Sequence, residues 1–288
     1  MRPEASRTYI HGYSGREAER LVDQAEALTR LLHHDTRYPA GSRVLEAGCG
    51  VGAQTVILAR QSPAAEITSV DLSAPSLALA GERVKTAGAG NVTFLQADIC
   101  ALPLRDRSFD HAFICFVLEH LPDPALALAS LHRVLRPGGS ITVIEGDHGS
   151  AFFHPDSGPA RKAIACLVAI QREMGGNALI GRSLSPLLTA AGFGEVAVSP
   201  RTVYADSSLP ELVEGFTRQT FTAMVEGVRD AALERGMVSR AGWEEGIRDL
   251  HRTAGPGGTF TYTFFKAVGV KPLTRSRGRA STRRPGSG

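Results

Sequence analysis

The stretch RVLEAGCGVGAQTVILA, Arg43 to Ala59, constrains the fold more than any other part of the chain. It consists of an apolar run, three closely spaced glycines and a second apolar run with helical spacing. A strand that turns through glycines into a helix is typical of α/β proteins, which bind nucleotide-like ligands at that turn. The stretch therefore predicts an α/β fold with a ligand at residues 48–53.

Strand and helix patterns alternate after this stretch. We predict strands at 43–48, 66–72, 91–98, 109–116 and 140–146, with helices that begin near Ala53, Pro75 and Pro124. This order predicts parallel strands with helices on both faces of the sheet. Two further strands are predicted at 195–205 and 258–269, and in the second of these aromatic residues alternate with threonines.

The remaining segments are assigned around this α/β domain, which we place at 41–270. Ser14 and Glu17 form a capping box that predicts a helix start, so residues 1–40 are interpreted as an N-terminal helical cap. Residues 206–256 have helical patterns and are too long for a hairpin loop, which is typical of a lid insertion. Residues 271–288 are basic and rich in Arg, Ser and Gly, and we expect them to be disordered.

Charge and cysteine usage narrow the class of protein. The net charge is +3, but the tail carries six cations and no acid, which leaves −3 for residues 1–270. A mildly acidic body disfavours a nucleic-acid partner. The N-terminus lacks a signal-peptide core, no stretch reaches the length of a membrane span, and Cys49, Cys100, Cys115 and Cys166 show no pairing pattern. We expect a soluble, cytoplasmic protein with reduced thiols and no membrane partner.

The glycine turn permits two ligands. GCGVGA, Gly48 to Ala53, satisfies the dinucleotide pattern, and Asp71 follows at about the usual distance. However, Glu46 lies two positions before the first glycine, where a carboxylate would repel a pyrophosphate and attract an ammonium group. Asp98 ends the next strand, and two acids at successive strand ends suit the ribose and the adenine of one adenosine. These features favour an adenosine ligand with a cationic head.

Five motifs in order, VLEAGCGVG, SVDLS, QADI, FVLEHLPDP and LRPGG, resemble those of the class I S-adenosylmethionine-dependent methyltransferases. The resemblance covers residues 42–146, about a third of the chain. It implies a Rossmann-like, seven-stranded, mostly parallel sheet with an antiparallel last strand, and S-adenosylmethionine as cofactor. It extends loosely to small-molecule methyltransferases of bacterial specialised metabolism.

The resemblance also implies which residues bind the cofactor. The methionine end is expected at Glu46 and Gly48, the ribose at Asp71, the adenine at Asp98 and Ile99, and the sulfonium side at Phe116. Further contacts are expected from Cys49, Gly50 and Leu72. An N-terminal helix covers the cofactor in related enzymes, which suggests Tyr13, although a hydrophobic staple explains Tyr13 about as well.

Methyl transfer needs a general base only when the acceptor must lose a proton. Candidates are His120, just past the fourth strand, Glu145 and His148, just past the fifth, and Tyr9 at the N-terminus. His120 belongs to a segment that recurs as scaffold in related enzymes, so a structural role is the alternative. Asp147, His148, His154 and Asp156 have the residue types of a metal site, but their spacing fits no common ligand set, and no metal is expected.

The acceptor is the least defined part of the prediction. Aromatic residues of the insertion and the last strand suit a pocket for a small apolar or aromatic metabolite, with C-, O- or N-methylation and indole or terpenoid carbon among the acceptors. The same residues at helical spacing are also typical of plain core. Methylation of RNA or protein, and an inactive cofactor-binding subunit, are the alternatives. Whether the chain forms a homo-oligomer is left open.

Overall fold

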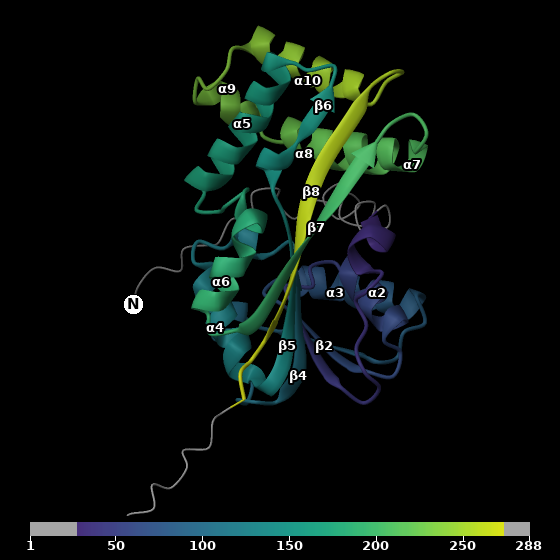
Figure 1. Ribbon diagram of the computed structural model, residues 1–288, viewed down its shortest axis with the longest axis vertical. Coiled ribbons are helices and arrows are strands. Elements are labelled where there is room, and N and C mark those ends of the chain that lie inside the picture. Colours follow the sequence, from purple (N-terminus) through teal and green to yellow (C-terminus); the bar gives the residue numbers. More distant parts are fainter. Residues whose placement is uncertain (1–27, 274–288) are drawn as a thin grey trace, which may run out of the picture.

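The computed structural model describes residues 28–273. Figure 1 shows a sheet flanked by helices, with a further group of helices above it, formed by residues 158–173 and 210–253, which we call the cap. Eight strands form one sheet in the order β3-β2-β1-β4-β5-β8-β6, with β7 also paired to β8. Strands β1 to β5 are parallel where they pair, and β8 is antiparallel to its three neighbours. The predicted α/β fold with an antiparallel last strand is confirmed.

The strands are β1 Arg43–Ala47, β2 Glu66–Asp71, β3 Val92–Gln96, β4 Phe109–Cys115, β5 Leu135–Gly146, β6 Phe152–His154, β7 Gly194–Ala205 and β8 Thr259–Val270. The helices outside the insertion are α2 Ala53–Gln61, α3 Ala74–Thr86, α4 Pro124–Val134, α5 Gly158–Glu173 and α6 Leu184–Ala190. Helices α3 and α4 begin where predicted, because Ser73 and Asp123 cap them and a proline occupies the first turn of each.

The short strand β6 is the eighth strand, where the sequence predicted seven. It pairs with the outer part of β8, from Phe152 opposite Thr261 to His154 opposite Thr259. A run of three residues between Gly149 and Pro155 is too short to show the alternation that identifies a strand. The pairing along β8 therefore creates a strand that the local pattern does not indicate.

Two hydrophobic cores lie on opposite faces of the sheet. Neighbouring residues Val44 and Leu45 of β1 belong to different cores, as the alternation of side chains along a strand requires. The first core continues into the cap, whereas the second lies under α4 and α6. Burial on both faces explains why the parallel strands are almost continuously apolar in sequence.

The insertion between β7 and β8 is helical, as predicted. It contains α7 Pro210–Leu212, a π-helix Val213–Thr222, α8 Ala223–Glu226, α9 Arg229–Glu234 and α10 Arg240–Thr253. The π-helix places Phe216 and Phe221 on the face that meets the Phe260, Tyr262 and Phe264 rings of β8, at centroid distances of 4.8 to 6.2 Å for five of the ring pairs. These rings, which the sequence offered for a pocket, pack against one another as the core of the cap.

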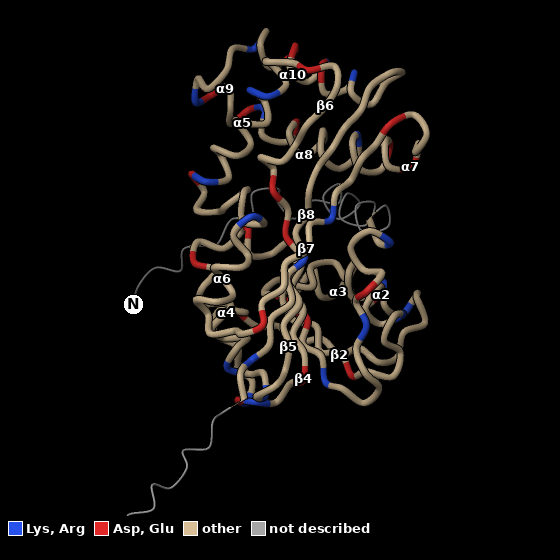
Figure 2. The backbone as a smooth tube through the Cα atoms, viewed as in Figure 1, with Lys and Arg blue, Asp and Glu red and all other residues tan. Residues whose placement is uncertain are grey.

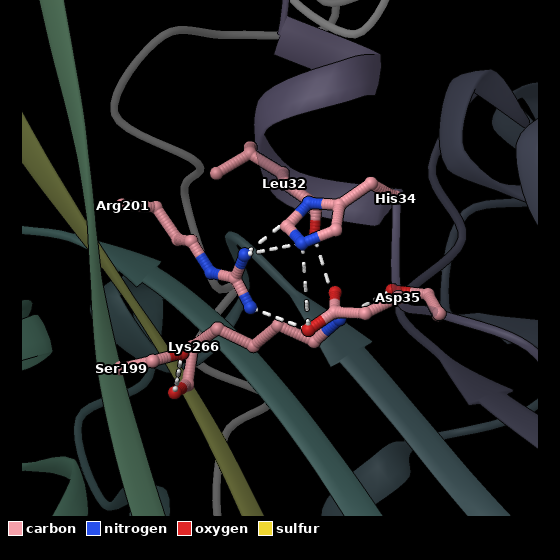
Figure 3. Close-up of polar contacts among 7 residues, drawn as sticks. Leu32, His34, Asp35, Ser199, Arg201 and Lys266 are labelled. Atoms are coloured by element: carbon pink, nitrogen blue, oxygen red, sulfur yellow. Dashed lines mark hydrogen bonds and ion pairs between the residues drawn. The ribbon is translucent and has the colours of Figure 1, made fainter.

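A buried lysine of β8 fixes the N-terminal region to the sheet (Figure 3). Residues 28–33 are helical, and after them Asp35 and Thr36 accept hydrogen bonds from Lys266 Nζ, whose side chain is only 4% exposed. Arg201 of β7 also pairs with Asp35. Although burial favours its neutral form, the hydrogen bonds from Lys266 and Arg201 lower the pKa of Asp35 to about 2.

The ends of the chain lie largely outside the described residues. The capping box of Ser14 and Glu17 falls in 1–27, and most of the expected tail falls in 274–288. Lys271, which we assigned to the tail, continues the sheet: its N–H bonds Gly139 O, and its Nζ bonds the carbonyls of His132 and Leu135. The predicted start of the tail therefore needs correcting to a later residue.

We expect Asp35→Asn to lower the free energy of unfolding by about 1–2 kcal/mol at pH 7, because it leaves a buried ammonium without its charge partner; the value allows for the 43% exposure of Asp35. Since the folded pKa lies below the ordinary value of 3.8, the stabilisation by Asp35 is complete above about pH 4 and is lost as the pH falls through about 2. Urea unfolding across this range measures both effects. The exposed Asp156, changed to Asn, is the control and should alter stability by less than about 0.5 kcal/mol.

Candidate functional site

The glycine turn after β1 adopts a backbone conformation that requires glycine. Gly48, Gly50 and Gly52 have φ angles of +74°, +52° and +81°. A Cβ on Gly48 would lie 2.6 Å from Cγ2 of Val117, and one on Gly52 would lie 2.8 Å from Cα of Ala80. A Cβ on Gly50 would meet no atom within 4 Å. The two ends of the turn therefore pack closely against Val117 and Ala80, whereas the space beside Gly50 is open.

Asp71, the last residue of β2, holds this turn. Its Oδ2 accepts the N–H of Gly50 at 2.8 Å, and its Oδ1 accepts the N–H of Ser73 at 2.9 Å. One carboxylate thus joins the glycine turn to the start of α3. Each oxygen keeps a second lone pair, which is what the predicted contact with ribose hydroxyls requires.

Glu46 is buried beside the turn. Its Oε2 accepts hydrogen bonds from Thr55 Oγ1 at 2.7 Å and from Ser69 Oγ at 2.6 Å. Burial raises the pKa of Glu46 to about 7, although the two hydroxyls favour the charged form. A carboxylate that is costly to ionise is stabilised by a nearby cation. The buried carboxyl of Glu46 therefore suits its predicted role beside an ammonium group.

The other predicted cofactor residues lie at the same end of the sheet. Asp98 caps the 3-10 helix Ile99–Ala101 through the N–H of Cys100, and Ile99 is buried there. Cys49 is buried in the glycine turn, and its N–H bonds Val70 O. Leu72 follows Asp71 and is 50% exposed, so its side chain is available to a ligand.

Phe116, at the end of β4, has a φ of +57°, which is uncommon for a residue with a side chain. Its N–H bonds Ile144 O, and its ring lies 5.4 Å from the ring of Phe264. Strained residues of this kind concentrate at functional sites. Phe116 immediately precedes Val117, which contacts the glycine turn, so its position agrees with the predicted place near the sulfonium.

These residues fit S-adenosylmethionine. The open face at Gly50 admits a ligand close to the backbone, and Glu46 suits an ammonium group. Asp71 ends β2, and Asp98 follows the end of the neighbouring strand β3. S-Adenosylmethionine would bring a methyl group already activated on sulfur, and the residues named here would hold its two ends. Among residues 28–273, no group of three or more His, Cys, Asp or Glu side chains is placed to hold a metal ion.

A polar cluster lies next to this site, where β4 and β5 end. Glu119 and His120 belong to the 3-10 helix Leu118–His120, and His148 begins the 3-10 helix His148–Ser150. The carboxylate of Glu119 lies between the two histidines, with Oε1 3.7 Å from Nε2 of His120 and Oε2 3.9 Å from Nε2 of His148. Nε2 of Gln171 donates to Oε2 at 3.2 Å. The structure thus brings two predicted catalytic residues together around a third group.

Glu145 supports the same segment from behind. Its side chain is 0% exposed, and its Oε1 accepts the N–H groups of Val117 and Leu118 at 3.0 and 2.8 Å. Burial, and next the charge of Glu119, raise the pKa of Glu145 well above its usual range, which favours the neutral carboxyl. Glu145 therefore fixes the backbone that leads from Phe116 to the Glu119 carboxylate.

Tyr262 and Arg182 complete the surroundings of His148. Nδ1 of His148 lies 2.8 Å from the hydroxyl of Tyr262, and a Cβ on Gly146 would come within 2.3 Å of that hydroxyl. Arg182 pairs with Asp147 through two hydrogen bonds of 2.6 and 2.8 Å. The Tyr262 hydroxyl orients the imidazole of His148, and Arg182 holds the neighbouring Asp147 carboxylate.

The sequence did not assign roles to Glu119, Gln171 or the Tyr262 hydroxyl. Tyr262 carried a signal, because a single hydroxyl in an inward row of phenylalanines indicates a buried hydrogen bond. Gln171 carried none, since it lies within the ordinary pattern of α5 and meets Glu119 only through the fold. Tyr9 and Tyr13 lie outside the described residues, so their predicted roles are not tested.

We expect Gly52→Ala to be more destabilising than Gly41→Ala, although both glycines have a positive φ. Alanine at Gly41 would meet nothing within 4 Å and bears only the backbone strain of about 1–2 kcal/mol, whereas alanine at Gly52 would also collide with Ala80. Chemical unfolding of the two variants checks the order. Equal losses would contradict the close approach of the turn to α3.

Comparisons with known proteins agree with this geometry. Residues 45–143 match the family model described as a methyltransferase domain. An uncharacterised 37.1 kDa protein in transposon TN4556 of Streptomyces fradiae is 36% identical over 190 residues, which cover 65% of this chain and 54% of that protein. Demethylmenaquinone methyltransferase of Staphylococcus aureus is 38% identical over 124 residues, 43% of this chain and 51% of the enzyme. The chain thus spans about half the length of these curated relatives.

Solved structures show the same fold at low identity. YcgJ of Bacillus subtilis has a TM-score of 0.56 and 16% identity, covering 86% of this chain and 98% of its own. A phosphoethanolamine N-methyltransferase of Haemonchus contortus, solved with S-adenosylhomocysteine, has a TM-score of 0.53 and 20% identity, with 87% and 53% covered. The cyclase SpnF has a TM-score of 0.52 and 24% identity, with 89% and 81% covered.

Among residues 28–273, no helix has both the length and the apolar character that crossing a bilayer requires. The described residues form an α/β sheet flanked by helices, with a glycine turn after β1 and acidic residues near the ends of neighbouring strands. The predicted cofactor, S-adenosylmethionine, is that of the methyltransferase family. Residues 45–143 thus match a methyltransferase domain, and the described chain around them has the fold of the solved methyltransferase structures.

Proposed function

We propose that this protein transfers a methyl group from S-adenosylmethionine to a small, apolar or aromatic metabolite. The observation that carries the proposal is the glycine turn held by Asp71, with the buried Glu46 beside it, inside a matched methyltransferase domain. Within the proposal Glu46 faces the ammonium group, Asp71 the ribose and Asp98 the adenine. Phe116 lies at the sulfonium side.

The charge pattern supports a small molecule rather than a nucleic acid as acceptor. Figure 2 shows Lys and Arg interspersed with Asp and Glu over the described part of the chain, rather than collected in one basic stripe. Nucleic-acid binding depends on such a stripe. The basic residues of 274–288 lie outside the described residues and leave RNA or protein methylation as the second candidate.

An apolar or aromatic acceptor is supported by the side chains beside Phe116. Its ring contacts Phe264, which continues into the aromatic core of the cap. Two similar proteins are named for small molecules, demethylmenaquinone methyltransferase and geranyl diphosphate methyltransferase, the latter with a TM-score of 0.52. The proposal covers methylation at carbon, oxygen or nitrogen, and it includes indole and terpenoid carbon as acceptors. A cytoplasmic location is supported by the free thiols, and a role in specialised metabolism rests on the sequence resemblance alone.

The contribution of the protein would be orientation. Methyl transfer is an in-line displacement, and correct placement of the two reactants supplies several kcal/mol of the barrier reduction. Glu46 and Asp71 hold the two ends of the donor, and Glu145 fixes the segment that carries Phe116, Glu119 and His120. The candidate catalytic residues are thereby aligned with the donor by the ends of β4 and β5.

The decisive experiment is an assay of the full chain with a labelled methyl donor and a panel of small apolar and aromatic metabolites, read by mass spectrometry. Transfer to a panel member supports the proposal. Transfer only to RNA or protein would favour the second candidate. Cofactor binding without transfer to any acceptor would indicate an inactive binding subunit. The assay is needed because a similar fold also occurs in SpnF, which is a cyclase.

We expect Asp71→Ala to weaken binding of S-adenosylhomocysteine by more than about tenfold, because it removes both the ribose contact and the bond that holds Gly50. Isothermal titration calorimetry measures the affinity. The control is Asp206→Ala, which removes a surface carboxylate that accepts hydrogen bonds from Ser208 and should leave binding unchanged. Retained affinity in Asp71→Ala would remove the ribose assignment.

We expect the affinity for S-adenosylhomocysteine to rise between pH 6 and pH 8. The carboxyl of Glu46 has a pKa of about 7, so it gains its charge in this range and then attracts the ammonium of the ligand. Glu46→Gln should bind with little dependence on pH over the same range. Titration calorimetry at three pH values compares the two proteins, and an unchanged affinity in the unmodified chain would contradict the contact.

A further inference from the structure

Glu119 occupies a position that its motif does not explain. It is a buried carboxylate whose two oxygens face different histidines, His120 at 3.7 Å and His148 at 3.9 Å. A scaffold residue that only caps a helix does not need two imidazole neighbours. The arrangement resembles that of an acid that orients a histidine base.

The surroundings fix one oxygen of Glu119 and direct the other to His120. Nε2 of Gln171 donates to Oε2, and the same oxygen faces His148, whose Nδ1 contacts the Tyr262 hydroxyl. The backbone that precedes Glu119 is also held, because Glu145 accepts hydrogen bonds from the N–H groups of Val117 and Leu118. Oε1 is therefore presented to His120 by a network that spans β5, α5 and β8.

His120 is the histidine that can reach a bound molecule. Its side chain is 15% exposed, whereas that of His148 is 4% exposed and lies beneath the cap rings. The segment that carries His120 starts at Val117, directly against Gly48 of the glycine turn. A base at this place is close to where the methyl acceptor must lie.

We propose that Glu119 is a positioning residue that holds the imidazole of His120 ready to take a proton from the methyl acceptor. The proposal rests on the proposed function and narrows its substrate class to acceptors that lose an O–H, N–H or C–H hydrogen. The acceptor's electron pair forms the bond to the methyl carbon, the sulfur–carbon pair returns to sulfur, and the released proton passes to Nδ1 of His120, the ring nitrogen that does not face Glu119. The carboxylate of Glu119 then stabilises the imidazolium.

Several groups on the elements packed around Glu119 lie close enough to interact with its carboxylate. They are His120 on its own 3-10 helix, Cys115 of β4, Glu145 of β5, His148 of the following 3-10 helix, Gln171 of α5 and Tyr262 of β8. Burial raises the pKa of Glu145, which disfavours a competing negative charge there. The histidines are the groups that pair with the Glu119 carboxylate.

The test compares the full chain with Glu119→Gln, His120→Asn and Glu173→Gln, using the acceptor found in the panel. Glu119→Gln should lower kcat by roughly ten- to a hundredfold and leave KM for S-adenosylmethionine unchanged. It should also move the rising limb of the plot of kcat against pH to lower pH, because the imidazolium loses its counter-charge. His120→Asn should abolish this rise of kcat with pH. Glu173→Gln, which alters an exposed ion pair with Arg235, should behave as the unmodified chain.

A second measurement does not depend on activity. The side-chain NMR signals of His120, identified by their loss in His120→Asn, should titrate at lower pH in Glu119→Gln than in the unmodified chain. An unchanged midpoint, or a kcat loss in Glu119→Gln without movement of the limb, overturns the positioning role. If the unmodified chain methylates nothing, the proposed function fails, and the NMR titration still decides whether Glu119 pairs with His120. Thermal unfolding midpoints confirm that the variants are folded.

Discussion

The hydrogen bond from Gly50 to Asp71 is the interaction on which the site depends. It joins the ends of β1 and β2 through one carboxylate and leaves the middle of the glycine turn open. Both partners are constrained independently, since the flanking glycines Gly48 and Gly52 already abut Val117 and Ala80. The turn is consequently preorganised by backbone geometry, and little ordering is needed when a ligand binds.

Three buried carboxyl groups near the carboxyl ends of the strands have different roles because their surroundings differ. Burial raises the pKa of Glu46 to about 7 against the effect of two hydroxyls, Glu145 holds two backbone N–H groups, and Glu119 lies between two imidazoles. Groups of one chemical type whose environments separate their charge states are typical of catalytic centres. The fold thus brings together three carboxyl groups that are far apart in the sequence and gives each different neighbours.

Much of this architecture was predictable, because alternation, glycine spacing and proline at helix starts are local properties. The strands β1 to β5, the capped helices and the helical insertion all follow from them. The predicted cofactor residues in 28–273 lie at one end of the sheet, since parallel strands end together. What local patterns missed depends on distant contacts: β6 exists through its pairing with β8, Gln171 reaches Glu119 across the fold, and Phe216 and Phe221 fill the core of the cap because a π-helix turns both toward β8.

Strand β8 has a mechanical consequence for the whole molecule. It runs without interruption from Thr259 to Val270, pairing with β6 at one end and β5 at the other, while β7 accompanies it along nearly its full length (Figure 1). The cap and the cofactor-binding sheet thus share a continuous two-strand ribbon instead of a flexible linker. Rotation of the cap as a rigid body would therefore require bending this ribbon.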